Sequence, residues 1–178
     1  MNTALSLAVA MTLAAPLFSQ PVPVQPESPL RLSTSFDLTI HASYAETAPL
    51  FGPEGERAWA GKHWDPQFIH PQPAHDEQGA VFTVRHGNLN AVWVNTLFDV
   101  EGRHFQYVYF LPDLMVTTID VHFKVVDPQT TGVHVEYTRT ALTSDGNEHV
   151  TAMIEGDKHT GTEWQQAIDA YLESHQQH

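Results

Sequence analysis

One long amphipathic segment near the end of the chain is the feature that most constrains how this sequence can fold. Residues on one side of it recur at spacings of four and three, which is the pattern of one face of an α-helix. These residues are Val150, Ile154, Asp157, Gly161, Trp164, Ile168 and Tyr171. Asp145 is a candidate N-cap of this helix, and Glu148 three residues later would complete a capping box. Gly156 and Gly161 lie inside it, so the helix either bends there or packs closely against another element.

The sequence before this helix favours β-strands joined by short turns. Phe36, Leu38 and Ile40 alternate with polar neighbours, which predicts a first strand over residues 35–41. Further strands are expected over residues 80–86, 91–100, 103–111, 115–126 and 133–142. The turns at Glu101-Gly102 and at 112–114 are short enough for hairpins, so the sheet is antiparallel.

Between the first two strands, residues 46–51 and 53–59 predict two short helices, the second with a proline in its first turn. A sheet with one apolar face must cover that face with another element. The only long element expected here is the C-terminal helix. We therefore predict an α+β chain in which a curved antiparallel β-sheet wraps around this helix and leaves a cleft beside it.

Hairpin register predicts which side chains face the helix. The first turn places Phe98 opposite Phe105 and Thr96 opposite Tyr107. The second turn likewise pairs Tyr109 with Thr117 and Tyr107 with Ile119. The predicted inner face carries Val92, Val94, Phe98, Phe105, Tyr107, Tyr109, Ile119, Val121, Phe123, Val133, Val135 and Tyr137. The predicted outer face carries Trp93, Asn95, Asp99, His104, Gln106, Phe110, Asp120, His122, Lys124, His134 and Glu136.

Several polar side chains share the predicted inner face, and they allow two interpretations. They either bond to one another and to an acidic group such as Asp157, or they line a cavity and orient a ligand. In the second interpretation Arg139 would bind an anionic or carbonyl group of that ligand. The candidate ligand-binding residues are Trp59, Trp64, Phe68, Thr96, Tyr107, Tyr109, Thr117, Tyr137, Arg139, His159 and Trp164.

The segment from Gly52 to Pro71 reads GPEGERAWAGKHWDPQFIHP and is neither a regular helix nor a regular strand. We expect it to close one end of the cleft, anchored by Trp59, Trp64 and Phe68. Glu56 and Arg57 would form an ion pair inside it.

Three motifs carry a family resemblance. They are residues 53–59 followed by 64–68, residues 79–83, and residues 135–142. Together with the element order, they resemble a bacterial branch of the START-like, or Bet v 1-like, superfamily of polyketide cyclases and lipid-transfer proteins. The resemblance covers residues 35–171. It implies a helix-grip fold with a hydrophobic cavity between sheet and helix. It implies no particular reaction and identifies no catalytic residue.

Three functions are compatible with this prediction. The first is a binding protein for a small apolar or amphipathic ligand, lipid-like or polyketide-like. The second is an enzyme of the cyclase/dehydratase or hydrolase type that uses Tyr, Arg and His groups in the same cavity. The third is an interaction protein whose core is filled by its own side chains, which would leave no cavity above roughly 300 Å³. We assign no catalytic residue and no cofactor. The sequence leaves open whether the protein forms a homodimer.

Charge and composition limit the classes of partner that the protein can bind. The chain has 21 acidic and 8 basic residues and a formal net charge of −13, which disfavours nucleic acid and anionic membrane surfaces. It contains no cysteine, so disulfides and thiolate chemistry are excluded. Histidines are frequent, but no HExxH motif is present, and we assign no metal site. The residues considered for one are His63, Asp65, His70, His75, Asp76 and Glu77, which we interpret as solvated loop side chains.

The first 32 residues are expected to lie outside the folded domain. Residues 1–20 include an apolar run whose length suits a signal peptide, although no Lys or Arg precedes it. The alternatives are a disordered tail or a start-site artefact. Residues 21–32 are a proline-rich linker, and residues 33–175 form the domain. With a signal peptide, the protein would be periplasmic or secreted and not inserted in a membrane; otherwise it would be cytoplasmic.

Overall fold

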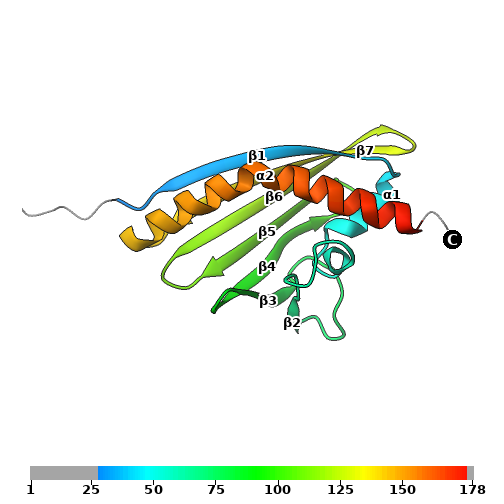
Figure 1. Ribbon diagram of the computed structural model, residues 1–178. Coiled ribbons are helices and arrows are strands. Elements are labelled where there is room, and N and C mark those ends of the chain that lie inside the picture. Colours follow the sequence, from blue (N-terminus) through cyan, green and yellow to red (C-terminus); the bar gives the residue numbers. More distant parts are fainter. Residues whose placement is uncertain (1–27, 176–178) are drawn as a thin grey trace, which may run out of the picture.

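The computed structural model describes residues 28–175, in which seven strands form one antiparallel sheet (Figure 1). The predicted signal peptide and most of the linker lie outside the described residues. The strands are β1 (Arg31–Ile40), β2 (Gln67–His70), β3 (Val81–His86), β4 (Leu89–Asp99), β5 (His104–Leu111), β6 (Met115–Asp127) and β7 (Thr130–Ala141). Their order across the sheet is β1-β7-β6-β5-β4-β3-β2. The two edge strands are β1, which pairs with β7, and β2, which pairs with β3. Neither of these two pairs is joined by a tight hairpin turn.

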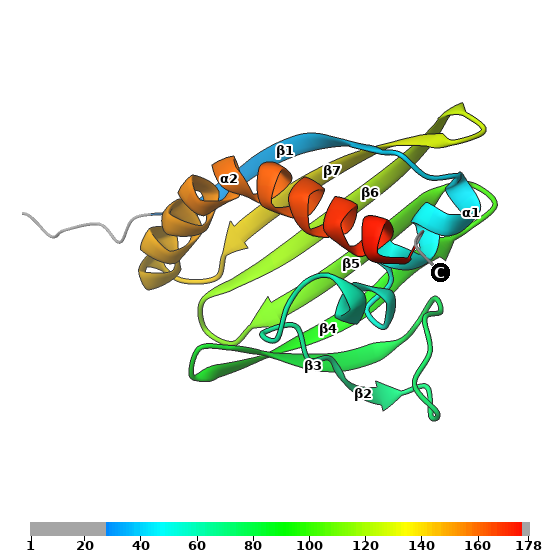
Figure 2. The same ribbon diagram turned by 45° about the vertical axis from the view of Figure 1, so that its right-hand side comes forward.

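The long helix α2 (Ser144–His175) lies across the concave face of this sheet, as Figure 2 shows. The predicted α+β architecture, a curved antiparallel sheet wrapped around a long C-terminal helix, is therefore confirmed. Two short helical regions follow the first strand, also as predicted. They are the continuous pair α1 (Tyr44–Thr47) and η1 (Ala48–Phe51), and then η2 (Gly55–Ala58). None of the described helices has an apolar stretch long enough to cross a bilayer.

Helix α2 is held close to strand β1 at one glycine. A Cβ atom added to Gly161 would lie 3.0 Å from the side chain of Phe36, whereas one added to Gly156 would meet nothing within 4 Å. Gly161 therefore permits the close approach that its position in the sequence suggested. The predicted N-cap was wrong by two residues, because Thr143 accepts a hydrogen bond from the amide of Gly146 at 3.2 Å. Asp145 is the second residue of the helix and lies in its first turn.

The sheet register is as predicted around both turns but not in the first half of β4. Phe98 pairs with Phe105, and Tyr109 pairs with Thr117. A β-bulge between Asn95 and Leu97 then places Asn95, and not Thr96, opposite Tyr107. An extra residue in one strand reverses which face every residue beyond it occupies.

The predicted faces of β4 are therefore wrong before the bulge. Trp93 and Asn95 are buried on the inner face, although the sequence pattern placed them outside. Val92, Val94 and Thr96 lie on the outer face, although the pattern placed them inside. Strand β2 was also missed, because its four residues lie between Pro66 and Pro71, which are typical of a loop.

Candidate functional site

A cavity of about 440 Å³ lies between the concave face of the sheet, helix α2 and the irregular residues 52–66. We call residues 52–66 the closing segment. The lining is rich in aromatic side chains from all three parts. They include Trp59 and Trp64 from the closing segment, Phe82, Trp93 and Tyr107 from the sheet, and Trp164 from α2. A space of this size and character is typical of a small-molecule site.

Hydrogen bonds from two indoles hold the closing segment in place. The Nε1 of Trp59 donates to the backbone oxygen of Leu50 at 2.7 Å, and the Nε1 of Trp64 donates to the backbone oxygen of Pro53 at 2.9 Å. The ring of Trp59 packs edge-on against Trp164 at 5.1 Å between centroids. The two hydrogen bonds join the closing segment to η1 and to its own backbone, and the ring contact connects it to α2.

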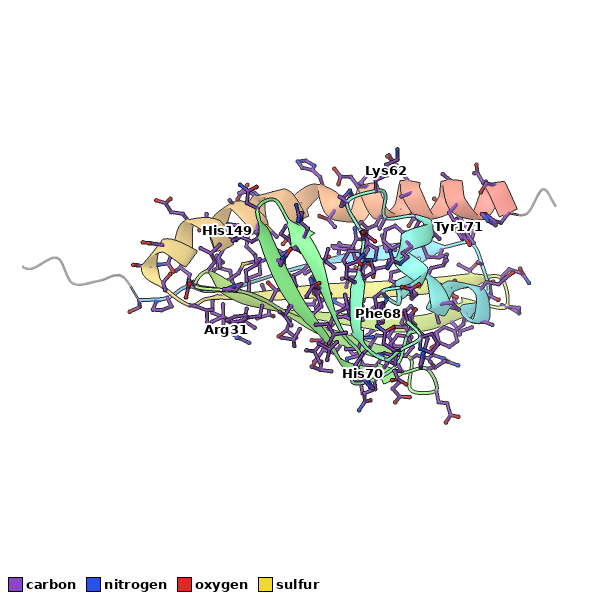
Figure 3. All side chains as sticks on the ribbon, turned by 90° about the horizontal axis from the view of Figure 1, so that it is seen from below. Arg31, Lys62, Phe68, His70, His149 and Tyr171 are labelled. Atoms are coloured by element: carbon purple, nitrogen blue, oxygen red, sulfur yellow. The ribbon has the colours of Figure 1, made fainter. Side chains whose placement is uncertain are left out.

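The closing segment is also bound to the loop that follows β2. The carboxylate of Asp76 accepts hydrogen bonds from the amides of Glu54 at 2.9 Å and Gly55 at 3.3 Å. Figure 3 shows Lys62 on the side of this region that faces α2 and His70 on the opposite side. The segment therefore spans the space from the outer strands of the sheet to the helix.

The predicted ion pair between Glu56 and Arg57 does not form. Arg57 faces solvent and pairs with Glu54 at 2.9 Å and with Asp65 at 2.6 Å. Glu56 lines the cavity. Consecutive residues of a 3₁₀-helix point about 120° apart, so adjacent side chains in η2 cannot share one environment.

A buried ion pair joins the sheet to α2 beside the cavity. The guanidinium of Arg139 on β7 binds both carboxylate oxygens of Asp157 on α2, with Nη2 and Oδ1 2.9 Å apart. The hydroxyl of Thr34 also donates to Asp157, at 2.7 Å. Arg139 is only 2% exposed. Arg139 is therefore paired with Asp157, as the first interpretation of the inner-face polar residues has it.

Three buried polar atoms of the cavity lining have no hydrogen-bond partner among the described residues. They are the Nε2 of His86, the Nε1 of Trp93 and the Nε of Arg139. Most buried polar atoms in proteins are hydrogen-bonded, because an unpaired one costs about 1–3 kcal/mol. All three atoms belong to residues that line the cavity.

Burial shifts the ionisation of the groups that line the cavity toward their neutral forms. It raises the pKa of Glu56 well above 4.5, and the nearby charge of Asp76 adds to this effect. Burial also raises the pKa of Tyr107 and of Tyr137, and it lowers the pKa of His86. The hydroxyl of Tyr107 donates to the backbone oxygen of Phe51. The cavity therefore disfavours added charge.

Replacing Glu56 by glutamine should stabilise the protein at neutral pH and not at acidic pH. Since the pKa of Glu56 is raised on folding, the native protein holds this proton more tightly than the unfolded chain. Stability from this group is therefore present below about pH 4.5 and is lost as the pH rises toward the native pKa. Urea unfolding of both proteins at about pH 4 and pH 7 measures the difference.

In that experiment, the gain in unfolding free energy from Glu56→Gln should grow between the two pH values. Glu101→Gln, in the exposed turn between β4 and β5, is the matched control and should show no such growth. A gain that is equal at both pH values would contradict a raised pKa of the half-buried Glu56.

The candidate ligand-binding residues divide into two groups in the structure. Seven of them line the cavity: Trp59, Trp64, Tyr107, Tyr109, Tyr137, Arg139 and Trp164. Four do not. Thr117 is fully buried in the sheet between Tyr109 and Arg139. Phe68 stacks on Phe82 at 5.3 Å near the sheet edge. Thr96 is exposed on the outer face because of the bulge, and His159 is exposed on α2.

His159 faces away from the cavity because of helix geometry. It follows the buried Asp157 by two positions, and two residues correspond to about 200° around an α-helix. Sequence reasoning also missed lining residues, namely Trp93, His86 and Glu56. Trp93 was hidden by the bulge. Asp157, which also lines the cavity, did have a signal in the sequence, as a charged residue on the apolar face of the helix.

Solved structures with the same fold share little sequence with this chain. Norcoclaurine synthase from Thalictrum flavum superposes with a TM-score of 0.61 at 11% identity, over 84% of this chain and 98% of that one. Mll3558 from Rhizobium loti has a TM-score of 0.56 at 14% identity, over 79% and 99%. Ara h 8.0201 has a TM-score of 0.55 at 11% identity, over 81% and 99%.

The chain has the helix-grip fold of START-like, or Bet v 1-like, proteins. The resemblance suggested by the three sequence motifs is thus supported at the level of the fold. No protein-family model matches the sequence. No curated protein matches it significantly either. At sequence identities of 11–14%, the similarity shows a shared fold and does not show a shared function.

Proposed function

We propose that the protein binds a small hydrophobic or amphipathic molecule in the cavity between the sheet and α2. The observation that carries this proposal is the set of three unpaired polar atoms, on His86, Trp93 and Arg139, among the residues of a largely apolar lining. In a purely structural core these atoms would stay without hydrogen bonds, which lowers the stability of the fold. A ligand with an apolar body and a polar end would both fill the space and pair with them.

The free hydrogen-bonding groups suggest the chemistry of the polar end. The N–H groups at Nε1 of Trp93 and Nε of Arg139 are donors, so the ligand needs an acceptor oxygen such as a carbonyl or phenol. Because Asp157 already neutralises the charge of Arg139, a neutral acceptor suits the site better than an anion. His86 can donate or accept, depending on its tautomer.

Fold neighbours provide support of a general kind. Norcoclaurine synthase has been solved in complex with dopamine and hydroxybenzaldehyde, at 12% identity to this chain. Both molecules carry an aromatic ring with phenol oxygen, and hydroxybenzaldehyde, which is neutral, is the kind of ligand that we propose here. The alternative of a filled core is disfavoured, because the cavity of about 440 Å³ exceeds the roughly 300 Å³ that it allows.

One observation favours a second candidate function, acid–base catalysis on the bound molecule. Glu56 lines the cavity and its pKa is raised well above 4.5, as in many catalytic acids. In a binding protein, Glu56→Gln should leave ligand affinity nearly unchanged and have no chemical consequence. In an enzyme, the same variant should bind the ligand and fail to convert it.

Native mass spectrometry of the protein purified from its source organism tests the binding function directly. We expect a co-purifying small molecule, and we expect the protein freed of it to bind the apolar dye ANS. A bare mass together with no dye binding would overturn the proposal.

A further inference from the structure

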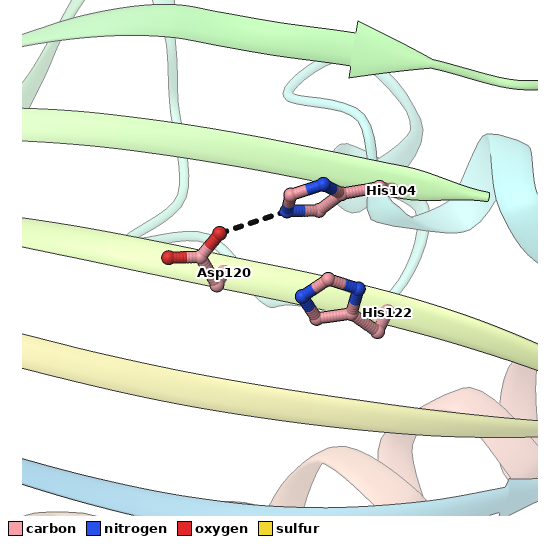
Figure 4. Close-up of side chains that lie close together, drawn as sticks. All are labelled: His104, Asp120 and His122. Carbon is pink, nitrogen blue, oxygen red and sulfur yellow. Dashed lines mark hydrogen bonds and ion pairs between the residues drawn. The ribbon is translucent and has the colours of Figure 1, made fainter. Parts of the chain in front are cut away.

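A second group of chemically active side chains lies on the outer face of the sheet, away from the cavity. His104 on β5 and Asp120 and His122 on β6 each offer one metal-binding atom, and these atoms all lie within 4.8 Å of one another (Figure 4). It is the one such group found among residues 28–175.

The sheet register explains why these three side chains meet. His104 pairs directly with His122, and Gln106 pairs with Asp120. Asp120 and His122 are two positions apart on one strand, so they point to the same face. Directly opposite residues on adjacent strands have Cβ atoms about 5 Å apart, which is close enough for their side chains to share one ion.

We propose that His104, Asp120 and His122 bind a divalent transition-metal ion such as Zn²⁺. Two imidazoles and one carboxylate are ligands that Zn²⁺ accepts in proteins, with a fourth position left for water or another molecule. Bond lengths of about 2.0–2.1 Å place the ligand atoms of a tetrahedral ion roughly 3.3 Å apart. The ligand atoms, which lie within 4.8 Å of one another, would have to move closer by side-chain rotation when the ion binds.

The contacts around Asp120 hold its carboxylate ready for such a role. The Nε2 of Gln106 donates to Oδ1 of Asp120 at 3.1 Å, and the hydroxyl of Thr96 donates to the side-chain oxygen of Gln106 at 2.8 Å. Side chains that orient a ligand in this way are usual around metal ions in proteins. Thr96 takes part because the bulge in β4 turns it to the outer face.

A simple surface ion pair does not account for the whole group. His104 and Asp120 are 2.8 Å apart and about 30% exposed, so those two could form a pair alone. His122 would then have no role, yet its ring stacks on that of His104 with centroids 4.0 Å apart and planes 19° apart. A shared ion gives both rings a function.

The adjacent histidine on the same face, His134, does not belong to the group of converging ligand atoms. His134 on β7 pairs with His122 in the sheet, but its Nδ1 lies 2.8 Å from Oδ1 of Asp37 on β1. The proposed ion is therefore bound between β5 and β6 only.

Isothermal titration of the full-length protein with Zn²⁺ tests the proposal, after removal of any polyhistidine tag. We expect one equivalent to bind. His104→Ala and His122→Ala should each weaken it at least tenfold, and Gln106→Ala should weaken it about tenfold. With Co²⁺ in place of Zn²⁺, the wild type should show visible absorption bands of a coordinated ion, and the double variant His104→Ala/His122→Ala should not.

Because the chain has 12 histidines, scattered weak binding must be separated from this site. His159→Ala, an exposed histidine on α2, is the matched control and should leave the affinity unchanged. Circular dichroism verifies that each variant is folded. The proposal is overturned if the double variant binds one equivalent with wild-type affinity, or if His159→Ala weakens binding as much as His122→Ala.

Discussion

Replacing Arg139 by alanine is expected to lower the free energy of unfolding by about 3–5 kcal/mol, a large part of the stability of a domain of this size. The variant leaves the carboxylate of Asp157 buried without its counter-ion. It also removes a link between β7 and α2, the element that covers the concave face of the sheet. Denaturant unfolding monitored by circular dichroism measures the loss.

Two further variants make this test specific. Arg57→Ala removes an arginine from a solvent-exposed ion pair and should cost about 0–1 kcal/mol. The double variant Arg139→Met/Asp157→Leu replaces both charges with apolar side chains and should recover most of the loss, since no buried charge remains unpaired. If Arg139→Ala costs no more than Arg57→Ala, the buried pair does not stabilise the fold as we infer.

Replacing Ala167 by tryptophan is expected to weaken ligand binding at least about a hundredfold while the protein stays folded. Ala167 lines the cavity from α2, so an indole at this position would occupy the space proposed for the ligand. Adding side-chain volume to a packed core costs typically 1–3 kcal/mol, but here the added atoms fill existing space. Titration with ANS, or with the molecule found by mass spectrometry, measures the change in affinity.

The matched control for this prediction is Ala170→Trp. Ala170 lies one turn further along the same helix and is exposed, so the same substitution there adds no atom to the cavity. Its affinity should equal that of the wild type. Equal binding by both variants would place the ligand elsewhere, whereas loss of binding in both would point to a general effect on α2.

Local sequence pattern was sufficient for most of the fold. The spacing of Val150, Asp157 and Ile168 predicted the buried face of α2, and all three residues are buried. The turn at Glu101-Gly102 predicted the pairing of Phe98 with Phe105. These features depend on residues close together in the chain, where period and turn length determine the geometry.

The candidate site was predictable only in part, because one extra residue in β4 altered its lining. The alternation rule assigned Thr96 to the inner face and Trp93 to the outer face, and the bulge reverses both. Nothing in a strict alternation of side chains indicates where such an irregularity falls. The partner of Arg139 was named among the candidates, but the sequence could not choose between Asp157 and a ligand.

By itself, the sequence determined that a run of antiparallel strands must be covered by one long helix, since no other element was long enough to bury the apolar face. Only the tertiary structure decided what lies on each side of that sheet. It paired Arg139 with Asp157, turned Glu56 into the cavity and brought His104 to within 4.0 Å, ring to ring, of His122. These contacts join residues far apart in the chain, and their distances depend on register and packing, which a local pattern does not contain.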